Sequence, residues 1–176
     1  GLSLSGSAAD YASAPSDIPM GAGSSFAVAA WLNPAAAPAG LQAAVSREGP
    51  NGSSFVLGVR DGAWAMCVGG GAAQICATSS TSAALGTWTF VAGIYDAVTG
   101  TVELVVGDPL YDPPATEPAY WAQPAPAPEA STGPLLVGRG SVSGAASYMF
   151  AGSVDSVFTW PGLPSVSDLR FGFDFA

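Results

Sequence analysis

The distribution of apolar residues along the chain is typical of short β-strands. Runs rich in Val, Phe, Ala and Trp are separated by Gly, Pro and Ser, and in several runs apolar residues alternate with small or polar ones. An alternation with a period of two residues indicates a strand with one buried face. We therefore predict strands over residues 26–33, 54–60, 63–68, 87–96, 100–107, 135–139, 148–160 and 169–175.

Turn residues punctuate these runs. Asp61-Gly62 predicts a two-residue hairpin, and residues 97–100 predict another turn. Pro or Gly interrupts the Ala-rich stretches, so the only helical turn we predict lies over residues 165–169, after Pro164. Many short strands with regular turns predict an all-β fold, an antiparallel β-sandwich or jelly roll. A length of 176 residues suits a single domain over residues 1–176.

Residues 108–134 break the strand rhythm. They hold eight of the 15 prolines, and proline has no backbone N–H to donate to a ladder, so we predict a surface loop rather than a strand pair. This loop carries Tyr111, Tyr120 and Trp121. Long loops in compact domains tend to be functional or disordered. Two roles stay open for the three rings: they contact a ligand, or they clamp the loop onto the sandwich.

Composition excludes several classes of protein. The chain has four cations, all Arg, against 13 acidic residues, so its net charge is −9 and we expect no nucleic-acid partner. The absence of His excludes Ser-His-Asp and Cys-His catalysis and His-ligated zinc. The positive mean hydropathy of +0.38 comes from alanine, and no run of about 18 large apolar residues is present. We therefore expect no membrane insertion.

The two cysteines lie in neighbouring short apolar stretches. Cys67 and Cys76 flank a Gly-rich turn, which predicts a hairpin, and a hairpin can hold two cysteines at bridging distance. A disulfide between them would indicate an oxidising, extracellular compartment. The alternative is a pair of reduced, buried thiols.

Five sequence blocks follow one another along nearly the whole chain. They cover residues 2–13, 24–47, 86–100, 132–140 and 150–155, and the most specific is Gly86-Thr-Trp-Thr-Phe-Val-Ala-Gly-Ile-Tyr-Asp96 followed by Thr99-Gly100. Together they resemble the laminin-G-like, concanavalin A-like jelly roll, in the versions found in secreted proteins of high-GC bacteria and in the tail proteins of their phages. The resemblance implies a fold rather than a function, because a sandwich hosts many unrelated sites.

The resemblance also implies a metal site. Some members of the family hold a structural calcium ion near the junction of the opening strands and the closing block. Calcium takes six to eight oxygen ligands. The matching candidates are Asp10 and Asp155, with carbonyls from residues 6–9, whereas Ser5 stands where the family often carries Asp. The alternative is that Asp10 caps a turn and Asp155 makes a structural hydrogen bond.

Enzymes of this fold place Glu-x-Asp-x-Glu on one strand, so that two carboxylates share a face. None of the chain's glutamates is followed two residues later by Asp. Asp96 and Glu103 flank one hairpin and could face each other, but such a pair is more often a solvated strand end than an acid/base couple. We therefore expect no enzymatic activity.

Sugar binding in such modules rests on exposed aromatic rings. Trp31, Trp64 and Trp88 lie within predicted strands, so we expect them in the core. The better ligand-binding candidates are therefore Tyr111, Tyr120 and Trp121, because loops carry binding function on a rigid scaffold. Three arginines, at positions 47, 60 and 139, either pair with carboxylates or contact sugar hydroxyls.

These observations predict a non-catalytic extracellular binding or adhesion module whose partner is a glycan or a protein surface. The alternative is a structural building block of a virion, such as a phage tail or capsid decoration, or of a surface assembly. A poorly charged, Ala-rich chain with a long Pro-rich arm favours that alternative. It would make the chain part of a homo-oligomer or a larger assembly.

Overall fold

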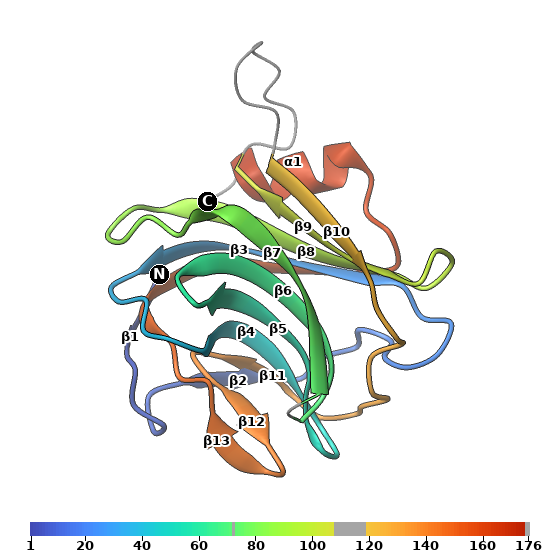
Figure 1. The fold of residues 1–176 in the computed structure, drawn as a ribbon, viewed down its shortest axis with the longest axis horizontal. Coiled ribbons are helices and arrows are strands. Elements are labelled where there is room, and N and C mark those ends of the chain that lie inside the picture. Colours follow the sequence, from blue (N-terminus) through green and yellow to red (C-terminus); the bar gives the residue numbers. More distant parts are fainter. Residues whose placement is uncertain (72, 108–118, 175–176) are drawn as a thin grey trace.

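Two antiparallel β-sheets face each other in the computed structural model, which describes residues 1–71, 73–107 and 119–174 (Figure 1). Sheet A has the strand order β1 (Leu2–Ser5), β14 (Ala151–Pro161), β3 (Phe26–Pro34), β8 (Thr89–Asp96), β9 (Thr101–Val106) and β10 (Ala119–Pro124). Sheet B has the order β13 (Ala145–Ser147), β12 (Gly140–Val142), β5 (Gly52–Arg60), β4 (Leu41–Gly49), β11 (Leu135–Val137) and β2 (Ala12–Ala14), and β6 (Ala63–Gly70) joins β5 to β7 (Ala73–Ser82). The arrangement confirms the predicted all-β jelly roll.

The main core lies between the sheets. Alternate residues of β3, among them Phe26 and Leu32, point inward and meet Phe55 of sheet B, whose ring centroid is 5.2 Å from that of Phe26. A side chain at Gly93 of β8 would collide with Met66 of β6, so glycine is needed there for the two sheets to approach. At one side of the sandwich β7 contacts β9 and β10, which brings the two sheets together at that edge.

The outer face of sheet A is also apolar. The other residues of β3 and β8, including Ala29, Phe90 and Ala92, are buried there and pack with Leu169 of helix α1 (Val166–Asp174), which contacts β3. Both faces of β3 and β8 are thus buried, which explains their nearly continuous apolar sequence. None of the helical structure described, in residues 1–71, 73–107 and 119–174, is long and apolar enough to span a membrane.

The helix corrects one predicted strand. A strand over residues 169–175 is wrong, whereas the helical turn predicted at residues 165–169 exists and extends to Asp174. Ser165 starts the helix with a capping box: its Oγ accepts from the Asp168 N–H at 3.2 Å, and the Asp168 carboxylate accepts from the Ser165 N–H at 2.8 Å. Capping and the burial of Leu169 outweigh the alternation of Leu, Phe and Phe in this segment.

The Pro-rich segment also needs a correction. Residues 119–124 form the edge strand β10, paired antiparallel with β9 from Ala119↔Val106 to Pro124↔Thr101. Pairing is possible because residues 119–123 contain no proline, and Pro124 lies at the end of the strand, where a missing N–H costs least.

Candidate functional site

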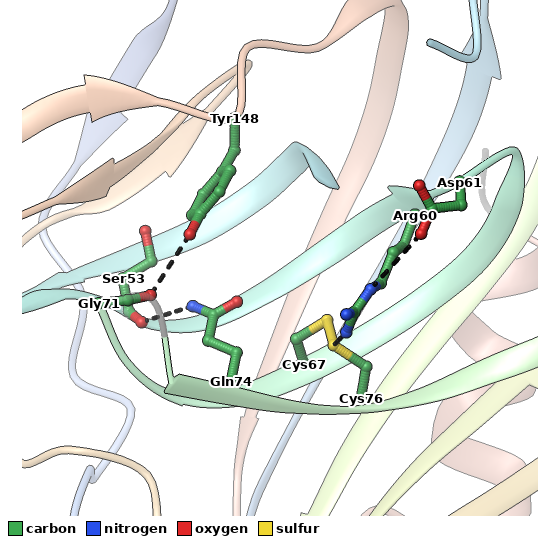
Figure 2. Close-up of a disulfide and its surroundings, with 8 residues drawn as sticks. All are labelled: Ser53, Arg60, Asp61, Cys67, Gly71, Gln74, Cys76 and Tyr148. Atoms are coloured by element: carbon green, nitrogen blue, oxygen red, sulfur yellow. Dashed lines mark hydrogen bonds and ion pairs between the residues drawn. A yellow bond between two sulfur atoms is a disulfide. The ribbon is translucent and has the colours of Figure 1, made fainter. Parts of the chain in front are cut away.

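A disulfide between β6 and β7 lies on the outer face of sheet B, and Figure 2 shows it beside Arg60. Cys67 and Cys76 lie directly opposite each other on β6 and β7 and are joined by a disulfide, so the alternative of two free thiols does not hold in this structure. Arg60 Nη1 donates to Cys76 Sγ at 3.0 Å, and its Nε lies 3.9 Å from the Asp61 carboxylate. The residues between Arg60 and the disulfide are small, and one of them, Ala65, is fully buried. This arginine therefore covers the disulfide.

On the side of the disulfide away from Arg60, Figure 2 shows Gln74 directed toward Ser53 and Tyr148 directed toward Gly71. The Tyr148 hydroxyl donates to the Gly71 carbonyl at 3.3 Å, and Gln74 Nε2 donates to the Ser53 carbonyl at 2.9 Å. These two donors therefore hold strands and turns of sheet B together, whereas the Gln74 amide oxygen is buried and makes no hydrogen bond in the described structure.

The two remaining candidate arginines also hold loops. Arg47 is only 3% exposed and donates to Ser16 Oγ at 2.8 Å, to the Ile18 carbonyl at 2.7 Å and to the Ser131 carbonyl at 3.3 Å. Burial lowers the pKa of this guanidinium. Arg139 stacks 3.5 Å above the centre of the Tyr11 ring. In the described structure these contacts support a structural role for both residues.

The structure does not bring Asp10 and Asp155 together. Asp10 accepts a hydrogen bond from the Ser5 N–H at 2.6 Å, whereas Asp155 lies 3.2 Å from the N-terminal amine of Gly1. The β1 ladder runs from Leu2 to Ser5 and Gly1 directly precedes it, so residues 1 and 5 lie about 13 Å apart along an extended strand. The carboxylates are therefore too far apart to share a calcium ion, whose oxygens lie about 2.3–2.6 Å away.

Each aspartate has a local role instead. Asp10 caps the turn after β1, and the hydrogen bond from the Ser5 backbone is the main cause of its lowered pKa. The N-terminal amine and the Ser156 N–H lower the pKa of Asp155 in the same way. Within residues 1–71, 73–107 and 119–174, no three His, Cys, Asp or Glu side chains converge into a metal site. Asp10 and Asp155 therefore do not form the shared calcium site that the resemblance implied.

The three predicted core tryptophans have three different environments. Trp64 is buried at 2% exposure, and Trp31 is half-buried with its ring edge-on to Phe90 at 5.9 Å. Trp88 is 42% exposed, so its predicted core position is wrong. Strand β8 begins at Thr89, and Trp88 therefore lies just outside the buried part of the strand.

The predicted ligand-binding aromatics also separate. Tyr111 lies outside the described residues. Trp121 points from β10 into the sandwich and packs against the main core, as the clamp hypothesis predicted. Tyr120 points the other way, because neighbouring strand residues face opposite sides, and it is 54% exposed on the outer face of sheet A. It is the one described member of the three that presents its ring to solvent.

A continuous row of polar side chains lies beside Tyr120. Thr99 Oγ1 donates to Asp96 Oδ2 at 2.8 Å and lies 2.8 Å from Thr101 Oγ1, which in turn donates to Glu103 Oε1 at 3.1 Å. Burial is the main cause of the raised pKa of Tyr120, followed by the charge of Glu103 and a hydrogen bond to it. The hydrogen bonds from the Thr99 side chain and the Val98 N–H lower the pKa of Asp96.

The strand register extends this row into a surface. Tyr120, Ala122 and Pro124 share the outward side of β10, and the last two lie opposite Glu103 and Thr101. We call the whole set the Tyr120 strip; it comprises Asp96, Thr99, Thr101, Glu103, Tyr120, Ala122 and Pro124. One side of the strip is apolar, the other is rich in oxygen atoms, and the set contains two carboxylates and no cation.

A second surface feature lies at the rim of sheet B. A hollow of about 430 Å³ is lined by Met20, Glu48, Pro50 and residues 130–133. None of its lining residues is aromatic. It therefore lacks the ring on which a sugar stacks, and the Tyr120 strip is the better candidate site.

Sequence reasoning identified parts of this strip separately. It selected Tyr120 for its ring and noted that Asp96 and Glu103 flank one hairpin. It did not place Tyr120 beside these two carboxylates, and it missed Thr99 and Thr101. The Thr-x-Glu spacing on a predicted strand was the available signal, because residues two apart share a face.

Comparisons with known proteins agree with this architecture. A laminin G family model, described as the Concanavalin A-like lectin/glucanases superfamily, matches residues 5–169. No curated protein sequence is significantly similar to the chain.

Three solved structures illustrate the likeness in fold. The Ruminococcus gnavus IT-sialidase CBM40 bound to α2,3-sialyllactose is 13% identical, with a TM-score of 0.63, and the match covers 85% of this chain and 83% of that one. Domain 4 of AbnA, an extracellular arabinanase from Geobacillus stearothermophilus, in complex with arabinotriose, is 17% identical, with a TM-score of 0.61 and coverage of 92% and 80%. Domains LG4-5 of the mouse laminin α1 chain are 17% identical, with a TM-score of 0.58 and coverage of 89% and 39%.

Proposed function

The chain belongs to the concanavalin A-like lectin/glucanases superfamily, and on that premise we propose that it is a non-catalytic, extracellular module that binds glycans through the Tyr120 strip. The observation that carries the proposal is the half-exposed Tyr120 ring beside a hydrogen-bonded row of two carboxylates and two threonines. Ligand sites typically combine an apolar or aromatic surface with a few fixed polar groups. A sugar has the matching pair of surfaces, an apolar ring face and a rim of hydroxyls.

The likeness to solved structures supports a binding role. Two of the similar folds were solved with a sugar bound, sialyllactose in one and arabinotriose in the other. The disulfide between Cys67 and Cys76 supports an extracellular location, because such bonds persist in oxidising compartments.

The chemistry of the strip supports binding rather than catalysis. A glycosidase needs one carboxylic acid that stays protonated to assist the leaving group. The hydrogen bonds that Asp96 accepts lower its pKa and therefore keep it ionised. Glu103 accepts the Thr101 hydroxyl and serves as an acceptor for the row.

A glycan array followed by calorimetry on its strongest hit tests the proposal. We expect Tyr120→Ala to weaken binding at least about tenfold, which corresponds to roughly 1.4 kcal/mol. The matched control is Tyr11→Ala, since that ring is 40% exposed but lies beneath Arg139 on another part of the surface. Equal loss in both variants, or undiminished binding by Tyr120→Ala, would remove the strip as the site. A wild-type protein that binds no glycan would contradict the function itself.

The virion or surface-assembly hypothesis makes a different prediction. A building block should self-associate at micromolar concentration, whereas a binding module can act as a monomer. Light scattering of the purified chain separates the two, and a monomer counts against the assembly.

A further inference from the structure

The polar row of the Tyr120 strip has fewer hydroxyl protons than hydrogen-bond contacts. Asp96, Thr99, Thr101 and Glu103 are linked by three close oxygen–oxygen contacts, of 2.8, 2.8 and 3.1 Å. Each threonine hydroxyl supplies one proton, and an ionised carboxylate supplies none. Two protons serve three contacts, so the hydroxyls have no proton left to offer a ligand and the row presents only acceptor lone pairs. A ligand hydroxyl that approaches the row can donate to those lone pairs.

The Tyr120 hydroxyl also has no proton left for a ligand, because it donates that proton to Glu103 in a hydrogen bond. The outward surface of the row therefore presents acceptor lone pairs and two negative charges. A matching ligand must donate several hydrogen bonds and must not carry negative charge, because like charges repel most strongly where no cation compensates them.

No arginine of the chain is placed to neutralise the two carboxylates of the strip. Arg47 is buried against loop carbonyls, and Arg60 lies on the disulfide beside Asp61. Arg139 covers Tyr11, and Arg170 forms an ion pair of 3.1 Å with Asp174 on α1. These four account for every Lys and Arg of the sequence, and each is engaged elsewhere.

The shape of the strip follows from the edge strand. Tyr120, Ala122 and Pro124 stand in a line on the outward side of β10, so the apolar side of the strip is about 13 Å long. The small Ala122 in the middle leaves this line low between the ring and the proline. Such a surface is longer than one sugar ring and suits an oligosaccharide that lies along the strand.

We propose that the Tyr120 strip selects extended, uncharged oligosaccharides whose hydroxyls donate to the row from Asp96 to Glu103, and that it rejects glycans bearing carboxylate or sulfate groups. The proposal rests on glycan binding at this strip, since it specifies which glycans bind there. It distinguishes this chain from a lectin site that uses arginine to hold an acidic sugar.

The experiment is an array of uncharged oligosaccharides of increasing length, together with uronic-acid, sialylated and sulfated glycans. Wild type should bind uncharged chains, more tightly as they lengthen beyond one ring, and should leave the acidic glycans unbound. Binding to the uncharged chains should not weaken in high salt, since no charge pair is involved. Tyr120-dependent binding of acidic glycans would overturn the proposal and leave the proposed function intact, and so would equal affinity for a single sugar and its oligomer. Absence of any Tyr120-dependent binding would instead contradict the proposed function.

Two variants test the role of the row. Glu103→Gln preserves shape but replaces an acceptor oxygen with an amide donor, so affinity for uncharged chains should fall about tenfold, while discrimination against acidic glycans should relax. Thr101→Val removes one hydroxyl without changing charge; it should weaken binding of uncharged chains and leave discrimination unchanged. Thermal melting confirms that both variants fold. Wild-type affinity and selectivity in both would show that the row does not contact the ligand.

Discussion

The outer face of sheet A carries large apolar side chains beneath a helix, whereas the outer face of sheet B carries a disulfide among mostly smaller side chains. On sheet A, Phe90 and Ile94 are buried with Leu169 of α1. On sheet B, Ala43 and Val56 lie next to the Cys67–Cys76 bond. The first face depends on buried apolar surface, which the helix removes from water. The second depends on a covalent link and on local hydrogen bonds.

This difference also explains where the candidate site lies. Helix α1 contacts β3, near the middle of sheet A, and the Tyr120 strip occupies the same face at the β9–β10 edge. On sheet B, Arg60, Gln74 Nε2 and the Tyr148 hydroxyl donate within the sheet, and the remaining acceptor, Gln74 Oε1, is buried. A ligand therefore finds exposed acceptor groups at the edge of sheet A, beyond the cover of the helix.

The largest expected effect comes from removing a large side chain from the outer face of sheet A. Phe90→Ala should lower the free energy of unfolding by about 3–5 kcal/mol, because a buried ring is lost and a cavity remains. Urea denaturation measures it. Leu85→Ala is the control, since that side chain is 53% exposed and its truncation should cost less than about 1 kcal/mol. A loss below 1 kcal/mol for Phe90→Ala would mean that α1 does not bury this face.

A smaller effect is expected on sheet B. Replacing both Cys67 and Cys76 by Ala should cost about 2–3 kcal/mol, because the bond closes only a short loop in the unfolded chain. The same denaturation experiment gives this value. Intact mass with and without reductant checks the bond itself: two free thiols in non-reduced, denatured protein would show that it does not form. A cost above that of Phe90→Ala would reverse the comparison between the faces.

The helix cap should contribute less again. Ser165→Ala removes the hydroxyl that accepts from the Asp168 N–H, and it should cost about 1 kcal/mol. Ser167→Ala, in the first turn of the same helix, should leave stability within about 0.5 kcal/mol. Equal effects of the two substitutions would show that the cap does not hold α1 on sheet A.

The smallest effect concerns acid titration at the strip. Because hydrogen bonds lower the pKa of Asp96 in the folded state, its charge stabilises the fold at pH values above the unfolded pKa. That stabilisation is lost as the pH falls through the folded pKa. Thr99→Val should raise the pKa of Asp96 toward its ordinary value of 3.8, which NMR titration of the carboxyl carbon detects. Asp168 has separate partners and should titrate unchanged; an unmoved Asp96 would contradict the row of hydrogen bonds.

Local signals made part of the fold predictable. The hairpin of β8 and β9 was expected at residues 87–96 and 100–107 and forms at 89–96 and 101–106, because the alternation and the turn both lie within a few residues. The cysteine hairpin was predictable for the same reason. The helix α1 was mistaken in part for a strand, since its Leu-x-Phe alternation also has a period of two. Its capping box, Ser-x-x-Asp, was the better guide.

Non-local features were beyond the sequence. The proline content of residues 108–134, taken as a whole, hid the proline-free stretch that pairs with β9. Tyr120 could be selected as a ring, but its position beside Glu103 depends on the register of that pair. Trp88 was expected in the core because it lies within a predicted strand. Its exposure depends on where β8 begins, which the sequence pattern does not fix to the residue. Asp10 and Asp155 were paired because of the resemblance to the family. Their separation depends on the register of β1 along β14, which is a property of the assembled sheet.

The pairing of β1 with β14 has a consequence for how the chain assembles. Leu2 lies opposite Val154, and Leu135 of β11 lies opposite Ala14 of β2, so these ladders join segments that are far apart in the sequence. Closing such long loops costs entropy before any contact repays it, and folds of this kind mature on the order of milliseconds to seconds. We expect the β6–β7 and β8–β9 hairpins to form early and the β1–β14 ladder to close late. Until then one edge of β14 remains unpaired, and this interval is when the nascent domain is most open to association with another chain.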